Sequence, residues 1–351
     1  MRRGADSLSL GTICIRADAS AEIGTGHVMR CLALAQAWQD AGGTAIFALA
    51  ESTPAILARL TAEGFEAIGI RACRGSSEDA QATLELSQSH NVDLIVLDGY
   101  EFGSEYQRRM KARANLLVVD DNGETGEFHC NFLLNQNLHA CDTMYVGRGS
   151  DAKLLLGPKF ALLRREFTKW RGWSREIPSV GRRLLITMGG TDPQDLTSRI
   201  LEAVPLVKIK NLEVRIAVSG SNPRIPELIT ACKQSKCAVS IEVDSSMPIL
   251  MAWADLAVAA AGSTCWEMCM FGLPAVLIDV ADNQRRIAAA LASREVSVHL
   301  GNAREVSAET IAVQVERLLR SQERREAMSQ KARNLVDGHG AERVVTELRL
   351  N

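Results

Sequence analysis

Short apolar runs alternate with longer amphipathic stretches along most of this chain. The runs are rich in β-branched residues and almost continuously apolar, as strands covered on both faces of a sheet are. In the first half they lie at residues 13–18, 44–49, 65–70, 93–98, 115–120 and 131–136. In the second half they lie at residues 183–190, 212–220, 238–243, 254–262, 274–279 and 296–301.

Helical spacing separates these runs. Apolar residues recur on one face of Val28–Asp40, and Gly42 and Gly43 provide a stop after it. The last part of the chain is also helical in pattern, over Ala308–Asn334 and again near the end. Alternating strands and helices predict βαβ units, and therefore an α/β fold with parallel sheets.

The pattern breaks once, at residues 157–181, which are rich in charge and tryptophan and lack a strand period. We interpret this stretch as a connection between two similar α/β halves. The expected organisation is an N-terminal Rossmann-like domain over 1–156, the connection, a C-terminal Rossmann-like domain over 182–335 and a C-terminal helix over 336–351, with a cleft between the halves. Trp170 and Trp173 either pack this junction or stack on a sugar.

Charge and composition exclude several classes of partner. A net charge of −2 favours neither nucleic acid nor an anionic membrane surface. No apolar run approaches the roughly 20 residues that span a bilayer, and the N-terminus lacks the apolar core of a signal peptide. Nine scattered cysteines indicate reduced thiols rather than a disulfide framework. These features predict a soluble cytoplasmic protein; they do not indicate its oligomeric state.

Ligands of open parallel sheets bind beyond the carboxyl ends of strands, so the loops there are the candidate sites. The first is Gly24-Thr25-Gly26-His27, which leads into a helix. Two interpretations stay open: a tight turn with a solvent-facing histidine, or a general base, since histidine titrates near neutral pH.

Two further loops lie in the second half. Met188-Gly189-Gly190-Thr191-Asp192 suits either close approach of a phosphate or sugar, or an ordinary turn in which Asp192 caps a helix that begins at Pro193. The stretch Ala259–Gln284 predicts a strand, then a short helix over Cys265–Phe271 capped by Ser263 or Thr264, with room at Gly262 for a diphosphate. Glu267 is spaced to contact a ribose diol. The alternative is a well-capped short helix without a ligand.

Metal binding has one weak candidate. Two His–Cys pairs, His129-Cys130 and His139 with Cys141, have zinc-binding side chains but not a common ligand spacing. The chain also lacks the Asp-x-Asp triplet with which other nucleotide-sugar enzymes bind a divalent metal. We therefore expect neither a metal nor a cofactor.

Taken together, the motifs resemble the hydrolases that cleave UDP-2,4-diacetamido-2,4,6-trideoxy-β-L-altropyranose in pseudaminic acid biosynthesis, a family related to the GT-B glycosyltransferase that makes lipid II. The resemblance covers about Ile13 to Gln284. It rests on RADAS-x-x-IGTGHVMR (16–30), LDGY (97–100), VVDDNGE (118–124), LLNQN (133–137), GPKFALLRREF (157–167), ITMGGTDP (186–193), AGSTCWE (261–267) and ADNQ (281–284).

The resemblance implies a GT-B fold and a role for each matching residue. His27 matches the base that activates water, and Tyr100 matches a tyrosine on the sugar side. Some relatives read Asp-His-Tyr where this chain reads Asp98-Gly99-Tyr100, which places more weight on His27. The full set of expected substrate-binding residues is Arg16, Asp18, Gly26, Tyr100, Gly189, Gly190, Gly262, Ser263, Thr264, Glu267, Asn283 and Gln284.

The implied reaction is attack of water on the anomeric carbon with departure of UDP and inversion of configuration. Asp18 and Asp98 end strands and are candidates either to stabilise the developing positive charge on the sugar or to act only as hydrogen-bond acceptors. Two alternatives remain: a glycosyltransferase of the same fold that uses a UDP-N-acetylated sugar, and a non-catalytic nucleotide-sugar binder. The sequence does not fix which diacetamido sugar is bound.

Overall fold

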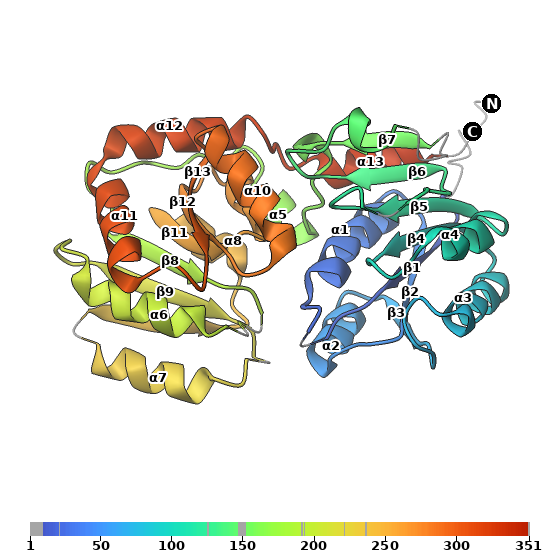
Figure 1. The fold of residues 1–351 in the computed structure, drawn as a ribbon, viewed down its shortest axis with the longest axis horizontal. Helices are drawn as coiled ribbons and strands as arrows, with labels where there is room; N and C mark the ends of the chain where they lie inside the picture. The colour runs from blue at the N-terminus through green and yellow to red at the C-terminus, as the bar shows by residue number, and fades with distance from the viewer. Residues whose placement is uncertain are drawn as a thin grey trace, which may run out of the picture. The chain divides into compact units, whose positions relative to one another are not determined.

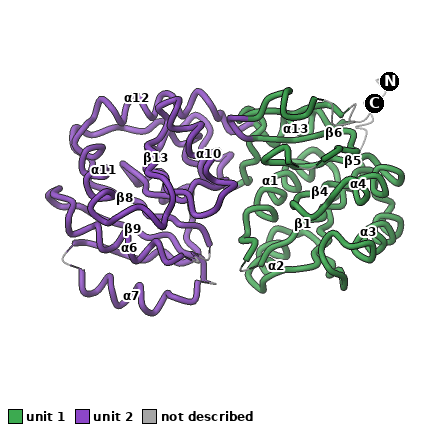
Figure 2. The backbone as a smooth tube through the Cα atoms, viewed as in Figure 1, with its two compact units in different colours: residues 1–136, 140–165, 340–351 green, residues 137–139, 166–339 purple. Residues whose placement is uncertain are grey.

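The computed structural model describes residues 10–20, 22–124, 126–146, 152–190, 192, 194–220, 222–235 and 237–349. The chain forms two compact units, each built on one parallel sheet (Figures 1 and 2). Unit 1 comprises residues 1–136, 140–165 and 340–351, and unit 2 comprises residues 137–139 and 166–339. No helix among the described residues is long and apolar enough to cross a membrane.

Unit 1 contains a seven-stranded parallel sheet in the order β3-β2-β1-β4-β5-β6-β7. Its strands are β1 (Thr12–Ala17), β2 (Thr44–Leu49), β3 (Glu66–Gly69), β4 (Val92–Asp98), β5 (Asn115–Val119), β6 (Phe132–Asn135) and β7 (Lys153–Leu156). Its helices are α1 (Gly26–Asp40), α2 (Pro54–Ala62), α3 (Ser77–Ser89), α4 (Ser104–Lys111) and α13 (Gly340–Leu348), with 3-10 turns η1 (Asp142–Met144) and η2 (Pro158–Phe160).

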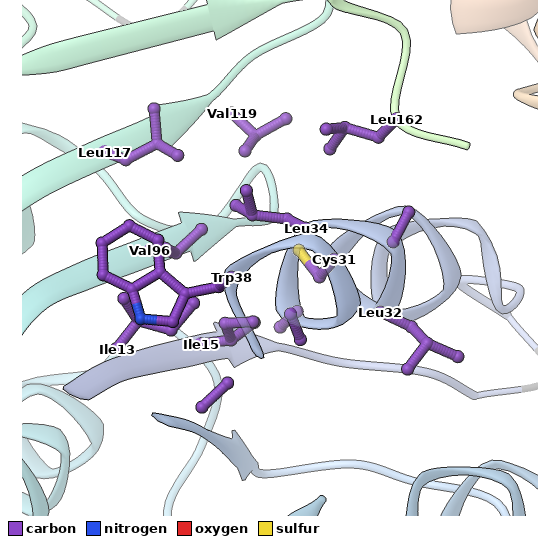
Figure 3. Close-up of a cluster of buried hydrophobic side chains, with 14 of the residues drawn as sticks. Ile13, Ile15, Cys31, Leu32, Leu34, Trp38, Val96, Leu117, Val119 and Leu162 are labelled. Atoms are coloured by element: carbon purple, nitrogen blue, oxygen red, sulfur yellow. The ribbon is translucent and has the colours of Figure 1, made fainter. Parts of the chain in front are cut away.

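Both faces of this sheet are buried, which explains the continuous apolar runs. Alternate residues of β1 enter different cores: Ile13 and Ile15 pack with α1, whereas Cys14 packs with residues of α3 and α4. Figure 3 shows the first of these cores, where side chains of α1 such as Leu34 and Trp38 lie on the strands.

Unit 2 repeats the architecture with a six-stranded parallel sheet in the order β10-β9-β8-β11-β12-β13. Its strands are β8 (Arg183–Thr187), β9 (Glu213–Val218), β10 (Ala238–Val243), β11 (Leu256–Ala260), β12 (Ala275–Asp279) and β13 (Ser297–Asn302). Its helices are α6 (Leu196–Ala203), α7 (Ile225–Gln234), α8 (Met247–Trp253), α9 (Thr264–Met270), α10 (Asp282–Ser293), α11 (Ala308–Arg320) and α12 (Gln322–Arg333), with the 3-10 turn η3 (Val204–Leu206). The short helix α5 (Arg165–Thr168) lies at the boundary: Arg165 is the last residue of a unit 1 segment, and the rest of α5 belongs to unit 2.

All twelve predicted strands and the predicted helix after the first of them are present, at boundaries within a few residues. Three features differ. The strand β7 was not predicted, because its four residues at the sheet edge follow a long polar stretch. The predicted helix 308–334 is two helices, since the Ser321 side chain accepts a hydrogen bond from the Arg324 N–H and begins α12. The expected connection 157–181 is divided between the units at Arg165.

The C-terminal helix α13 belongs to unit 1, where it packs against α1 and η2. Its first residue, Gly340, lies directly on the backbone of Ala161: a Cβ atom there would be 2.1 Å from the Ala161 oxygen and 2.5 Å from its nitrogen. Only glycine allows this approach, so the contact excludes a side chain at the first residue of α13.

We expect Gly340→Ala to lower the free energy of unfolding by roughly 1–3 kcal/mol, because the added methyl group forces the helix off the backbone that it contacts. Urea denaturation followed by circular dichroism measures the effect. Gly69→Ala is the matched control, since a Cβ atom at Gly69 meets no atom within 4 Å. Equal midpoints for the two variants would contradict the close packing of α13.

Candidate functional site

The first group of predicted residues lies at the carboxyl edge of the unit 1 sheet. In the observed strand order, β1 and β4 are neighbours, and the chain leaves them toward opposite sides of the sheet. Such a switch in strand order opens a crevice at the strand ends. The loops that follow β1, β4 and β5 therefore bring His27, Asp98, Tyr100 and Asp121 together.

His27 is the second residue of α1 and forms a short hydrogen bond with Asp98, the last residue of β4. The His27 Nδ1 to Asp98 Oδ1 distance is 2.6 Å. A carboxylate accepts but does not donate, so Nδ1 carries the proton and Nε2 carries the basic lone pair. The Asp98 side chain is fully buried, whereas 11% of the His27 side chain is exposed. The histidine is thus fixed in one tautomer and still reached by solvent.

Arg30, one turn further along α1, connects two buried carboxylates. Its Nε and Nη2 atoms donate to the two oxygens of Asp98, both at 2.6 Å, and its Nη1 donates to Asp121 Oδ1 at 2.8 Å. Burial alone would raise the pKa of Asp98, but the charges of Arg30 and His27 lower it well below the usual range. Burial likewise opposes ionisation of Asp121, and Arg30 lowers that pKa as well. Both carboxylates are therefore ionised at neutral pH.

Tyr100 lies beside the histidine. Its ring is 5.3 Å from the imidazole, centroid to centroid, in an edge-on arrangement, and its hydroxyl donates to Asp121 Oδ2 at 3.0 Å. The exposed fraction of the Tyr100 surface is 51%. The aromatic side chain is therefore available to a ligand that reaches His27.

Two predicted residues of unit 1 have structural contacts instead. Arg16 is completely buried and donates two hydrogen bonds to Asp79, at 2.9 and 2.8 Å. The Asp18 carboxylate accepts from the backbone N–H groups of Ala50 and Glu51, at 2.7 and 2.9 Å. Both side chains thus fix the loops around the strand ends, and we do not propose that they contact substrate. Gly26, the first residue of α1, has open space where a Cβ would lie.

Sequence reasoning missed Arg30 and Asp121. A signal for the arginine was present: it lies three residues after His27, a spacing that places two side chains on the same side of a helix. Asp121 belongs to the acidic pair that follows β5, and only the order of strands in the sheet shows that this strand end lies next to β4.

The second group lies at the carboxyl edge of the unit 2 sheet, at the ends of β8, β11 and β12. Side chains connect these loops. Gln194, after β8, donates to the Val280 oxygen at 2.6 Å, and the Gln284 amide oxygen accepts from the Val280 N–H at 3.1 Å. The Gln284 amide nitrogen would lie 3.9 Å from a Cβ at Gly262. In this sheet β8 and β11 are neighbours, and the strands that follow each of them lie on opposite sides of the pair. The strand order therefore reverses between β8 and β11, beside these loops.

The loop and helix after β11 follow the prediction in outline. The helix α9 begins at Thr264, one residue earlier than expected, and Ser263 is its N-cap residue. The Ser263 side chain forms no capping hydrogen bond, contrary to the expectation that Ser263 or Thr264 caps the helix. Glu267 lies in the first turn with 6% of its surface exposed. Asn283 and Gln284 lie in the first turn of α10, both partly exposed.

The loop after β8 differs from the prediction. The helix α6 begins at Leu196 rather than at position 193, because the Asp192 carboxylate accepts from the N–H groups of Leu196 and Thr197, at 3.0 and 2.8 Å. Gly189 has a φ of +84°, a conformation that favours glycine, and is exposed, next to the partly buried Gly190. Thr191 and Pro193 lie outside the described residues.

The remaining candidates contact other parts of the chain. His129 lies 3.3 Å from the Glu127 carboxylate, and no three His, Cys, Asp or Glu side chains in the described ranges are grouped to bind a metal ion. Trp170 and Trp173 both pack against Phe271 of unit 2, at centroid distances of 5.5 Å. These aromatic rings therefore contribute to the packing of that unit.

Comparisons with known proteins agree with this architecture. Residues 183–344 match the glycosyltransferase family 28 C-terminal domain. The UDP-2,4-diacetamido-2,4,6-trideoxy-beta-L-altropyranose hydrolase of Campylobacter jejuni is 27% identical over 217 residues, covering 62% of this chain and 72% of that protein. The spore coat polysaccharide biosynthesis protein SpsG of Bacillus subtilis is 24% identical over 346 residues, covering 95% and 96%.

Among solved structures, Acinetobacter baumannii MurG superposes with a TM-score of 0.66 at 17% sequence identity, covering 97% of this chain and 99% of that one. At this identity the superposition establishes the fold and not the reaction. The two Rossmann-like units and the motif resemblance are both confirmed: the chain has the GT-B fold and is related to the UDP-2,4-diacetamido-2,4,6-trideoxy-altropyranose hydrolases.

Proposed function

We propose that this protein is a metal-independent hydrolase that cleaves UDP-2,4-diacetamido-2,4,6-trideoxy-β-L-altropyranose to UDP and the free sugar in pseudaminic (nonulosonic) acid biosynthesis in the cytoplasm. The observation that carries the proposal is the 2.6 Å pair of His27 with buried Asp98, next to exposed Tyr100. A base fixed in one tautomer at a strand-switch crevice is the arrangement that activation of water requires.

In the proposed reaction His27 Nε2 takes a proton from water as the water oxygen bonds to the anomeric carbon. The bond between that carbon and the diphosphate oxygen breaks, its electron pair leaves with UDP, and attack from the opposite face inverts the configuration. Asp98 faces the imidazolium that forms and stabilises its charge. Tyr100 packs against the sugar from beside the histidine.

We assign UDP to the strand ends of unit 2. Gly189 and Gly190 allow the backbone to approach the nucleotide. The donors at Gly262, Ser263 and Thr264 meet the diphosphate as it gains charge, and preorganised donors of this kind are a large part of catalysis. Glu267 contacts the ribose, and Asn283 and Gln284 contact the sugar and phosphate.

The test is to incubate the pure protein with the altropyranose UDP sugar and, separately, with UDP-GlcNAc, without acceptor or metal, and to follow UDP release. Release from the first alone is the expected result. Release from neither, with UDP bound tightly, would contradict the hydrolase.

A glycosyltransferase that uses a UDP-N-acetylated sugar is the second candidate, because the matched domain model is that of a glycosyltransferase family. Its acceptor takes the place of water. UDP release that requires an added acceptor distinguishes this reaction from hydrolysis.

Glu267→Gln is expected to weaken UDP binding about tenfold or more, because a hydrogen bond to a charged group contributes about 1.5–3 kcal/mol. Isothermal titration calorimetry with UDP measures the change. Glu227→Gln is the matched control, since Glu227 also lies in the first turn of a unit 2 helix but is exposed on α7. An unchanged dissociation constant for the Glu267 variant would remove this residue from the nucleotide site.

A further inference from the structure

The hydrogen bonds of unit 1 form a continuous network that extends beyond the His27–Asp98 pair. From His27 it runs to Asp98 at 2.6 Å, then to Arg30 at 2.6 Å, to Asp121 at 2.8 Å and to the Tyr100 hydroxyl at 3.0 Å. The Tyr100 ring also contacts the imidazole edge-on, at a centroid distance of 5.3 Å. His27 and Tyr100 are therefore connected through the fully buried Asp98 and through Arg30 and Asp121, whose side chains are 7% and 11% exposed.

The charges of this network are unequal. Two carboxylates share one guanidinium, which leaves one net negative charge beside the His27 imidazole. Protonation of the imidazole neutralises that charge. The neutral groups nearby are the Cys31 thiol, which donates to Asp98 Oδ2 at 3.3 Å, and the Tyr100 hydroxyl. The neighbouring Asp120 carboxylate accepts instead from the Tyr145 hydroxyl at 2.7 Å, and burial raises its pKa.

Geometry adds to the effect of charge. Arg30 uses one edge of its planar fork for both oxygens of Asp98 and a third nitrogen for Asp121, which a lysine ammonium does not reproduce. Asp121 in turn uses one oxygen for Arg30 and the other for Tyr100. Loss of either group disturbs both His27 and Tyr100.

We propose that Arg30 and Asp121 are positioning residues of this site: through Asp98 and Tyr100 they set the affinity of His27 for a proton and the placement of the tyrosine beside it. This inference rests on the proposed function for its role in catalysis, but the network itself is tested without substrate. Neither residue touches the reacting atoms.

The test is a pH titration of the His27 imidazole by NMR, with its signal identified as the one lost among the chain's six histidines in the His27→Ala protein. Asp121→Asn removes a negative charge and keeps the shape of the side chain. The imidazolium is then less stabilised, so we expect the midpoint to move to lower pH by on the order of 1 unit. Arg30→Gln removes the positive charge, so the midpoint should move to higher pH.

Opposite directions separate this proposal from general loosening of the fold, which would move both variants alike. Asp93→Asn is the control, because it makes the same change of charge as Asp121→Asn at a distant place. Asp93 lies on β4 like Asp98, but near the opposite end of the strand, where it accepts from the Thr12 N–H at 2.8 Å. Its midpoint should match that of the unchanged protein. Thermal unfolding establishes which variants are folded. If only one of the two variants folds, the direction of its His27 midpoint shift still tests the proposal.

A folded Asp121→Asn or Arg30→Gln protein whose His27 titrates at the original pH would overturn the proposal. If the shifts occur while no UDP is released from any substrate, the network stands and the hydrolase assignment falls. Where turnover is measured, the acidic limb of kcat/KM should move in the same direction as the NMR midpoint, because the unprotonated base is the active form.

Discussion

His27→Ala is expected to lower kcat for UDP release at least a hundredfold while the dissociation constant of UDP stays unchanged. A positioned general base contributes about 10²–10⁴-fold, and alanine has no group to take its place. The imidazole presents a basic lone pair at Nε2, whereas its partner Asp98 is fully buried. Initial rates of UDP release and calorimetry with UDP measure the two quantities separately.

His90→Ala is the control for this variant. His90 also belongs to unit 1, but it lies at the end of α3, where its ring Nδ1 donates to the Leu86 oxygen at 3.0 Å. Its turnover should stay within about twofold, as for surface substitutions that leave the active site intact. If His27→Ala turns over at the same rate as His90→Ala, His27 is not the base.

Asp98→Asn is expected to lower kcat by about 10²–10⁴-fold with little change in KM. The asparagine amide can donate to Nδ1, which moves the imidazole proton to Nε2 and leaves the wrong nitrogen basic. The variant also removes the negative charge that faces the imidazolium, and leaves Arg30 with Asp121 as its only ionic partner in the network. Steady-state kinetics with the altropyranose UDP sugar measure the loss.

The contribution of stability to this result is separable. Asp98 is buried and ionised, so its replacement also lowers the free energy of unfolding, and circular dichroism must show a folded protein at the assay temperature. Asp93→Asn, at the other end of β4, should retain full activity. A folded Asp98→Asn protein with unchanged kcat would show that the tautomer of His27 does not matter to the reaction.

The local pattern of apolar residues was sufficient to predict the strands whose two faces are both buried in a sheet. The runs at 93–98 and 115–120, for example, became β4 and β5, since a continuous apolar run between polar turns has few other stable conformations. It was not sufficient where side chains rather than periodicity set a boundary. Asp192 delays the start of α6 through two hydrogen bonds, and Ser321 divides the last predicted helix through one, and a periodic pattern contains none of these.

The candidate site shows the same division. The motif around His27 indicated a loop at a strand end, with the histidine as either a turn residue or a base, because glycine turns before a helix are recognisable within a few residues. Asp98 was recognisable as a strand-end candidate, but its pairing with His27 and the role of Asp121 were not recognisable in this way. Asp98 and Asp121 lie 71 and 94 positions after His27 in the chain. They approach His27 only because β4 and β5 follow β1 in the sheet.

By itself, therefore, the sequence determined the α/β class, the positions of nearly all strands and the loops in which polar residues follow them. Each of these depends on side-chain preferences and burial within about ten neighbouring residues. The tertiary structure decided which strand ends are adjacent and that Arg30 connects Asp98 to Asp121. It also showed that Arg16 donates to Asp79 and that Asp18 accepts from the Ala50 N–H. Those facts depend on strand order, which short-range pattern does not encode.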